Sequence, residues 1–327
     1  MEQILGIGNA LVDVLVRIDN DEIINDFGLA KGGMTLIDQA QYKNIAQHLE
    51  ETQLDFTKRT GGSAGNALLA VAALGGEARF IGKRGRDANG KFYARERGAQ
   101  GVTPIALFDE SLPTGVAHTF VFPDGQRTFA TYLGAAATMQ ADELSEAWFD
   151  GARYFFIEGY LVQNHSLIDT AVDLARKAGA KVCLDLASWN IVEQDRDFFR
   201  HLLTKTDIVF ANEEEALAMT GCEGEAALEW RSGVCPMAVV KLGAKGALAQ
   251  QGSKRTQVDA VVCPQVVDTT GAGDFFAGGF LFQLAQGRSL QSALTLGAAC
   301  AAEVIQVMGT RIDDTAWQRL QQLAQQR

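Results

Sequence analysis

Residues 266–280 read Val-Val-Asp-Thr-Thr-Gly-Ala-Gly-Asp-Phe-Phe-Ala-Gly-Gly-Phe. Val266 and Val267 are β-branched and predict the end of a strand. The small residues after them predict a tight turn, and the apolar segment that runs to Gly287 predicts a helix. The turn would then lie at a helix N-terminus, where the first backbone N–H groups have no partner within the helix. Such a turn can bind an anion such as a phosphate.

Asp274 places a carboxylate in the same turn. This arrangement suits phosphoryl transfer, because the carboxylate can take the proton from an attacking hydroxyl while the N–H groups hold the migrating phosphoryl group. The alternative is an ordinary strand-to-helix turn with an acidic start, which the helix dipole also favours.

The run Asp-Thr-Thr-Gly-Ala-Gly-Asp-x-Phe-x-Gly-Gly-Phe at residues 268–280 closely resembles the C-terminal signature of the ribokinase-like sugar and nucleoside kinases, the phosphofructokinase-B family. The resemblance implies that Asp274 is the catalytic base and that the amides of Gly271, Ala272 and Gly273 form the anion hole. It also implies a three-layer α/β fold, in which helices cover both faces of a mostly parallel central sheet, with a small β-sheet lid.

The composition is that of a folded, acidic protein. The chain has 327 residues, 47% of them hydrophobic, and a net charge of −11 from 40 acidic and 29 basic residues. This charge disfavours nucleic-acid binding. The five cysteines show no C-x-x-C spacing, and the four histidines have no metal-site spacing. The N-terminus lacks the basic start of a signal peptide, and the uncharged run at residues 289–302 is too short to span a membrane, so we expect a cytoplasmic protein.

The order of predicted elements divides the chain into a core and a lid. From Gly134 onward, strand-like and helix-like segments alternate, which predicts a parallel sheet with helices on both faces. Strand-like segments at residues 14–37 and 102–132, with a hairpin at residues 123–125, predict a small sheet without helices. We assign residues 1–12, 39–104 and 133–327 to the core, and residues 13–38 and 105–132 to the lid.

Two motifs near the N-terminus are candidates for acceptor binding. Asp13 lies in an apolar run and could face solvent on an alternating strand, but Gly-Asn-x-x-x-Asp at residues 8–13 resembles the family's N-terminal motif, whose aspartate holds substrate hydroxyls. The Gly-Gly-x-x-x-Asn segment at residues 61–66 matches a second hydroxyl-binding motif, although a tight loop before a helix would look the same. Leu11, Leu133 and Tyr160 fall where flat apolar walls for an adenine ring could be built. The expected substrate-binding residues are Asn9, Leu11, Asp13, Gly61, Gly62, Asn66, Arg127, Leu133, Glu158 and Tyr160.

The nucleotide and metal contacts are expected in the C-terminal half. Asn212 and Glu215 match the family's Asn-x-x-Glu, which lies near magnesium, although acids also favour a first helical turn. We expect Glu215 to bind Mg²⁺ through water. Residues 241–246 resemble the family's nucleotide loop, which often begins with threonine, whereas this chain has Lys241 at that position. The expected ATP contacts are Asn212, Lys241, Gly243, Gly246, Thr269, Gly271, Gly273, Ala298 and Ala302, although the two alanines would equally suit tight helix packing. Asp268 and Thr270 resemble a site for a monovalent cation such as potassium.

The resemblance implies an ATP-dependent kinase that phosphorylates a primary hydroxyl. Residues 31–38, 184–188 and 207–215 resemble adenosine kinases, so adenosine is the favoured acceptor. Glu158 would also suit free ribose or fructose, because sugar kinases often place an acid there to bind a hydroxyl. Gly6-x-Gly8 suggests a Rossmann dehydrogenase as an alternative, but this chain has leucine at position 11, where the third glycine of that motif would fall. A catalytically silent nucleoside-binding protein is a further alternative. We expect a monomer or a lid-mediated homodimer.

Overall fold

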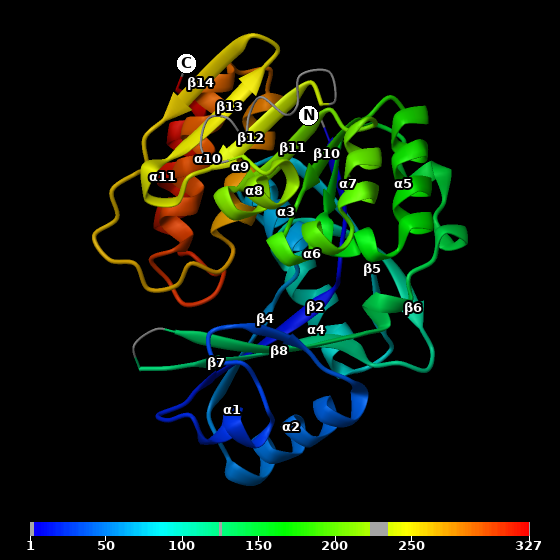
Figure 1. Ribbon diagram of the computed structural model, residues 1–327, viewed down its shortest axis with the longest axis vertical. Coiled ribbons are helices and arrows are strands. Elements are labelled where there is room, and N and C mark those ends of the chain that lie inside the picture. The colour runs from blue at the N-terminus through cyan, green and yellow to red at the C-terminus, as the bar shows by residue number, and fades with distance from the viewer. Residues whose placement is uncertain (1–2, 124–125, 223–234, 327) are drawn as a thin grey trace.

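The computed structural model describes residues 3–123, 126–222 and 235–326. It consists of a large α/β body and a smaller sheet, the lid, below the body in the view of Figure 1. The predicted fold class is therefore confirmed. Within the described residues, no helix is both long and apolar enough to cross a bilayer.

The sheet of the body has nine strands in the order β14-β13-β12-β11-β10-β9-β1-β5-β6. Neighbouring strands from β12 to β6 are parallel, while β12-β13 and β13-β14 are antiparallel. The strands are β1 (Gln3–Ile7), β5 (Glu77–Gly85), β6 (Val102–Asp109), β9 (Ala152–Glu158), β10 (Lys181–Asp185), β11 (Ile208–Asn212), β12 (Met237–Lys241), β13 (Ala247–Gln251) and β14 (Lys254–Val258). Because parallel strands end at one edge, their carboxyl ends form a common rim for a site.

Helices cover both faces of this sheet. One face carries α3 (Ser63–Ala73), α9 (Ala272–Ala285) and α10 (Leu290–Val304), with α11 (Asp314–Gln325) packed against them. The other face carries α5 (His165–Lys177), α6 (Trp189–Gln194), α7 (Arg196–Leu203) and α8 (Glu213–Thr220), while α4 (Ala88–Ala99) lies beside β6. Short 3-10 helices occupy Ala135–Thr138, Ala141–Glu143, Glu146–Trp148, Gly159–Gln163 and Gly243–Lys245.

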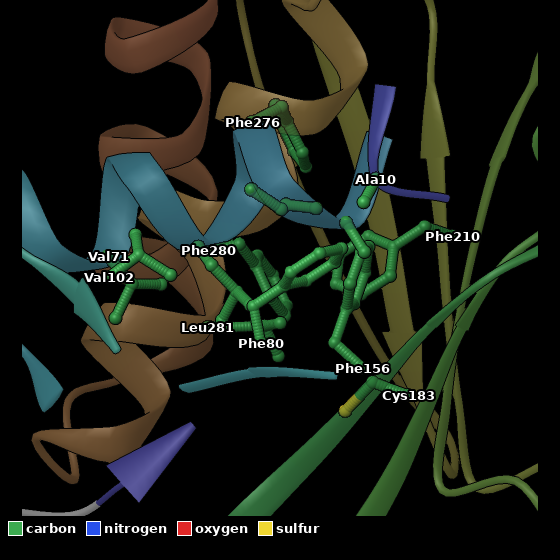
Figure 2. Packing of buried hydrophobic residues seen from close by; sticks show 14 of the residues in the cluster. Ala10, Val71, Phe80, Val102, Phe156, Cys183, Phe210, Phe276, Phe280 and Leu281 are labelled. Carbon is green, nitrogen blue, oxygen red and sulfur yellow. The ribbon is translucent and has the colours of Figure 1, made fainter. Parts of the chain in front are cut away.

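The two faces are built by alternation along the strands. In β1, Ile4 packs into the core under α3 and α9, whereas Leu5 and Ile7 pack into the core on the opposite face. Figure 2 shows the first of these cores, where Phe156 and Phe210 meet Phe280 of α9. Both faces of a parallel sheet are buried in this way, so its central strands are largely apolar, as in the run Tyr154–Ile157 of β9.

The lid sheet has five strands in the order β3-β8-β7-β2-β4. They are β2 (Leu11–Arg17), β3 (Met34–Leu36), β4 (Phe56–Thr60), β7 (Thr114–Val121) and β8 (Arg127–Gly134). The predicted hairpin between β7 and β8 is confirmed by their antiparallel pairing, although Asp124 and Gly125 at its turn lie outside the described residues.

Two features of the predicted lid are wrong. The lid is not free of helices, because α1 (Glu22–Asp26) and α2 (Gln39–Thr52) pack against it and the ring of Tyr42 stacks on Tyr132 at 4.9 Å. Its strands also differ from the predicted ranges, since β4 belongs to the lid and β6 to the sheet of the body. A five-stranded sheet needs an apolar cover on one face, and α2 supplies it.

The strand predicted to end at Val266 and Val267 is absent from the structure, in which this segment is irregular. Val266 is 58% exposed, and the amides of Val267 and Asp268 donate to the carbonyl oxygen of Ile305 at the end of α10. The β-branched residues therefore do not enter a sheet. Their backbone instead satisfies a helix C-terminus.

Candidate active site

Two cavities meet at the N-terminus of α9. The lid cavity has a volume of about 570 Å³ and lies between the lid and the carboxyl ends of β9, β10, β11 and β12. The apolar cavity, of about 540 Å³, is lined by the β12–β13 turn, by residues 260–269 and by α10. Lys241, Gly243, Ala272 and Gly273 line both cavities.

The turn before α9 separates the cavities and has the geometry of an anion site. Gly271 is the N-cap residue and has a φ of +77°, which glycine adopts without strain. A Cβ at this position would lie 2.8 Å from Cγ2 of Thr310. Gly271, Ala272 and Gly273 line the lid cavity, and the last two also line the apolar cavity, so the start of α9 lies at the junction of the two cavities. The amide of Ala272 also donates to the carbonyl oxygen of Thr269 at 3.2 Å.

Asp274 lies at the floor of the lid cavity, in the first turn of α9. Ser63 donates its hydroxyl to Oδ1 at 2.7 Å, and Asn66 donates its amide to Oδ2 at 3.0 Å. Burial raises the pKa of Asp274, although these two hydrogen bonds lower it. A carboxylate held in this way and raised in basicity is suited to accept a proton.

Asp13 faces the same cavity from the lid strand β2. Burial raises the pKa of its carboxyl to about 7, although the Arg97 guanidinium lowers it. A Cβ at Gly61 would collide with the Asp13 carboxylate, which explains the glycine. The side chain of Asp13 is therefore placed to accept hydrogen bonds from hydroxyl groups of a bound molecule.

Arg97 of α4 is a buried cation beneath these groups and is only 1% exposed. It donates to the carbonyl oxygen of Gly61 at 2.9 Å and to Oδ1 of Asn66 at 2.8 Å. Because the other end of the Asn66 amide donates to Asp274, Arg97 fixes which way that amide points. The helical pattern gives no sign of this role, and the sequence analysis missed it.

Glu158 ends β9 and is 1% exposed. Its Oε1 accepts from the backbone and side-chain amides of Asn9 at 2.8 and 2.6 Å, and its Oε2 accepts from the amide of Ala64 at 2.9 Å. Burial raises the pKa of Glu158 to about 7, although the three bonds lower it. Its carboxyl thus joins β1 and α3.

The Gly6-x-Gly8 pattern that suggested a dinucleotide fold also has a packing explanation. A Cβ on Gly6 would lie 2.8 Å from Cδ1 of Leu68, and a Cβ on Gly8 would collide with the Glu158 carboxylate and lie 2.8 Å from Cβ of Ala64. Both glycines therefore allow α3 to approach β1.

Lys241 ends β12, and Glu215 lies in the first turn of α8, directly after β11. The Lys241 ammonium is 2.9 Å from Oδ2 of Asp185, and burial lowers its pKa while the carboxylates of Asp185 and Glu215 raise it. Glu215 forms a capping box with Asn212, accepting from its backbone and side-chain nitrogens at 2.8 Å each. Burial raises the pKa of Glu215, although Lys241 lowers it.

Arg127 of β8 reaches from the lid to the body. Its guanidinium is 2.7 Å from Oδ2 of Asp268 and 3.2 Å from Oγ1 of Thr270. Asp268 also accepts from the amides of Thr270 and Gly309 at 2.9 and 2.6 Å. The side chains predicted to hold a monovalent cation are thus already bound to a guanidinium, and this arrangement does not fit potassium at these oxygen atoms.

The structure brings most of the predicted residues to the two cavities. The lid cavity is lined by Asn9, Leu11, Asp13, Gly62, Asn66, Arg127, Leu133, Glu158, Tyr160, Asn212, Glu215, Lys241, Gly243, Thr270, Gly271, Ala272, Gly273 and Asp274. The apolar cavity adds Gly246, Thr269, Ala298 and Ala302. Gly61 and Asp268 lie behind the lining, against Asp13 and Arg127. Sequence reasoning missed Ser63 and Asp185 as site residues, as well as the apolar lid residues Leu15, Met34 and Leu36.

The fold and the site define a phosphotransferase that acts on hydroxyl groups. Consistent with this, the model of the pfkB family carbohydrate kinases matches residues 28–317, and the chain belongs to that family. A probable fructokinase from Arabidopsis thaliana is 31% identical over 76% of this chain and 82% of its own length.

Two solved structures resemble the whole chain. The probable sugar kinase from Rhizobium etli CFN 42 has a TM-score of 0.88 and 33% identity, and the match covers 98% of both chains. The adenosine kinase from Sinorhizobium meliloti has a TM-score of 0.87 and 34% identity, covering 98% of this chain and 99% of that one. The chain is thus a sugar or nucleoside kinase of the pfkB family.

Proposed function

We propose that the protein transfers the γ-phosphoryl group of ATP to the primary hydroxyl of adenosine and so produces AMP. One observation carries the reaction type: Asp274 lies beside the glycine turn, at the floor of a cavity closed by a lid, and is held by Ser63 and Asn66. The adenosine kinase from Sinorhizobium meliloti is similar along its whole length, which supports a nucleoside acceptor.

The chemistry follows from these positions. Asp274 takes the proton of the attacking hydroxyl, whose oxygen forms a bond to the γ-phosphorus. The bond between that phosphorus and the oxygen it shares with the β-phosphate breaks, and the electron pair leaves with ADP. The amides of Gly271, Ala272 and Gly273 stabilise the negative charge on the moving group, while the lid keeps water from acting as acceptor.

The walls of the lid cavity support a flat, apolar acceptor group. They include the lid side chains Leu11, Leu15, Met34, Leu36, Phe129 and Leu133, with Tyr160 and Ile191 from the body. Met34 and Leu36 are 42% and 51% exposed, so they have apolar area available for a ligand. An adenine ring would bury such surface, whereas a free sugar would leave it wet.

Glu158 also bears on the choice between a nucleoside and a free sugar. Each of its carboxylate oxygens already accepts at least one hydrogen bond from within the protein, and the side chain is 1% exposed. It is therefore a weaker candidate for binding a sugar hydroxyl than Asp13, which faces the cavity. This favours adenosine, while the similarity to a fructokinase and a sugar kinase keeps ribose and fructose as the second candidate.

Asn212 and Glu215 are suited to hold magnesium through water. Both line the lid cavity, and each Glu215 oxygen uses one lone pair within the capping box. The described part of the chain has no cluster of three or more His, Cys, Asp or Glu side chains placed to bind a metal directly. When bound, Mg²⁺ would keep several of its own waters and would supply positive charge near the phosphate groups.

The test is a comparison of kcat/KM for adenosine, ribose and fructose, measured by ADP release in one assay. Adenosine should be the best acceptor. A sugar preferred by more than about tenfold would replace adenosine in the proposal. If adenosine binds but none of the three acceptors causes release of ADP, the protein is a catalytically silent nucleoside-binding protein instead.

A further inference from the structure

Lys241 occupies the junction of the two cavities. It is the last residue of β12, lines both cavities and is the single charged residue in the described lining of the apolar one. A Cβ built on Gly273 would lie 3.0 Å from the Lys241 Nζ atom, so the ammonium lies directly against the first turn of α9. A phosphate bound by the amides of that turn would be within reach of this ammonium.

The charge of the lid cavity makes this position significant. Five carboxyl groups line it, those of Asp13, Glu158, Asp185, Glu215 and Asp274. Within the described lining, the basic side chains are Arg127 and Lys241, and Arg127 forms a buried ion pair with Asp268 behind the wall. A polyphosphate would meet a negative field there unless cations compensate for it. Lys241 is the basic side chain beside the anion turn.

We infer, on the basis of the proposed function, that Lys241 is a catalytic residue that donates hydrogen bonds to the transferring phosphoryl group, and that Asp185 positions its ammonium. An ammonium has three donors, so the pair with Asp185 leaves others free. Asp185 is itself fixed, since its Oδ1 accepts from the amide of Ala187 at 2.9 Å. The lysine therefore meets the phosphoryl group with its position already set.

This role fits the balance of the reaction. As the new bond to the acceptor oxygen forms and the bond to the ADP oxygen breaks, the hydroxyl proton passes to Asp274 and negative charge spreads over the phosphoryl oxygens. A fixed positive charge beside those oxygens lowers the barrier more than it strengthens ground-state binding, provided that water is excluded. Lys241 keeps its proton throughout and acts as a charge.

The test separates this role from simple packing. Lys241→Met removes the charge and keeps a long apolar chain. Because it leaves the Asp185 carboxylate unpaired, the double variant Asp185→Asn/Lys241→Met is measured beside it. The control is Lys245→Met in the same loop, whose side chain is 76% exposed and lies outside both cavity linings.

Two measurements decide the inference. By calorimetry, both Lys241 variants should bind an unhydrolysable ATP analogue about tenfold more weakly than wild type, with ADP affinity changed by less than about threefold. With the acceptor that gives the highest kcat/KM, the kcat of both Lys241 variants should fall by about 10²–10³ while KM for the acceptor stays nearly unchanged. Lys245→Met should match wild type in both.

Each outcome has a separate meaning. Equal losses for ADP and the ATP analogue would move the contact to the part of the nucleotide that both share and would overturn the inference. A folded double variant with wild-type kcat and affinities would overturn it as well. A wild-type protein that binds neither nucleotide and phosphorylates no acceptor would overturn the proposed function itself.

Discussion

Asp274 shows how one side chain in this protein obtains its chemistry from residues far away in sequence. Its two hydrogen-bond donors, Ser63 and Asn66, belong to α3, and Asn66 is in turn held by Arg97 of α4. Donors on both oxygens fix the carboxylate, while burial raises its pKa. The donors on α3 therefore set the position of the carboxylate, and its basicity reflects burial offset in part by the same donors.

Asp274→Asn tests the assignment of the base. The amide keeps the shape but cannot accept the hydroxyl proton, so kcat should fall by about 10²–10⁴ while ATP affinity and the melting temperature change little. Steady-state kinetics and calorimetry check this. The control is Asp197→Asn, at a side chain that is 96% exposed, and it should keep wild-type turnover. Near-normal turnover of Asp274→Asn would contradict the assignment.

Asp13 should make acceptor binding depend on pH. Burial raises the pKa of its carboxyl to about 7, so the protonated form dominates below that pH. A protonated carboxyl is a poorer acceptor for substrate hydroxyls, and KM for the acceptor should therefore rise as the pH falls from about 8 to about 6.

The matched variant for this pH effect is Asp13→Asn. It should reduce kcat/KM at about pH 8 by about tenfold or more, since a hydrogen bond to a charged group is lost, and it should flatten the KM profile. The fall of kcat at acid pH should persist in Asp13→Asn, because Asp274 is still present and must be deprotonated to accept the hydroxyl proton. A KM profile that is identical in both proteins would argue against a hydroxyl contact at Asp13.

At the scale of single elements, helix α9 depends on the backbone of Gly271. Valine there would have to adopt a φ near +77° and would press its Cβ against Thr310. We expect Gly271→Val to lower the free energy of unfolding by about 1–3 kcal/mol and to raise KM for ATP sharply, since the turn would shift. Thermal melts and ATP kinetics measure the two effects. A folded variant with unchanged ATP kinetics would place the anion site elsewhere.

Local sequence predicted elements well where the partners are local. Asp38 is a residue type favoured at the N-cap, and it caps α2 and forms a capping box with Gln41 three residues later. Ser63 is also a residue type favoured at the N-cap, but the N-cap of α3 is Gly62, and the Ser63 hydroxyl donates to Asp274 instead. The prediction of a strand ending at Val266 and Val267 was wrong because β propensity describes only the local sequence. The backbone of Val267 instead pairs with the carbonyl oxygen of Ile305, which is distant in sequence.

At the scale of the whole molecule, the motifs indicated which residues form the site but not how they are connected. The contact between Ser63 and Asp274 joins positions 211 residues apart, and no periodicity in either helix signals it. Arg97 was equally hidden, because an arginine on a helix is usually exposed and this one is buried under the cavity. Such contacts depend on how α3, α4 and α9 pack together.

The lid and the body should move relative to each other when the acceptor binds. Residues that line the lid cavity come from both, and the ion pair between Arg127 of β8 and Asp268 of the body crosses between them. In Figure 1, β7 and β8 lie between the body and the helices α1 and α2, and Thr119 of β7 and Phe129 of β8 line the lid cavity. Opening must break the Arg127 pair, and a bound acceptor favours the closed form by joining both sides.

Hydrogen exchange measures this closure. The amides of β7 and β8 should exchange more slowly when saturating adenosine is added, because closed molecules protect them. The amides of α5, which packs against the sheet of the body and lines neither cavity, should not change and serve as the internal control. Arg127→Met should exchange faster than wild type in β8 without ligand, since the pair that holds the lid is lost. Equal exchange in β7 and β8 with and without adenosine would mean that this sheet is a fixed wall of the cavity.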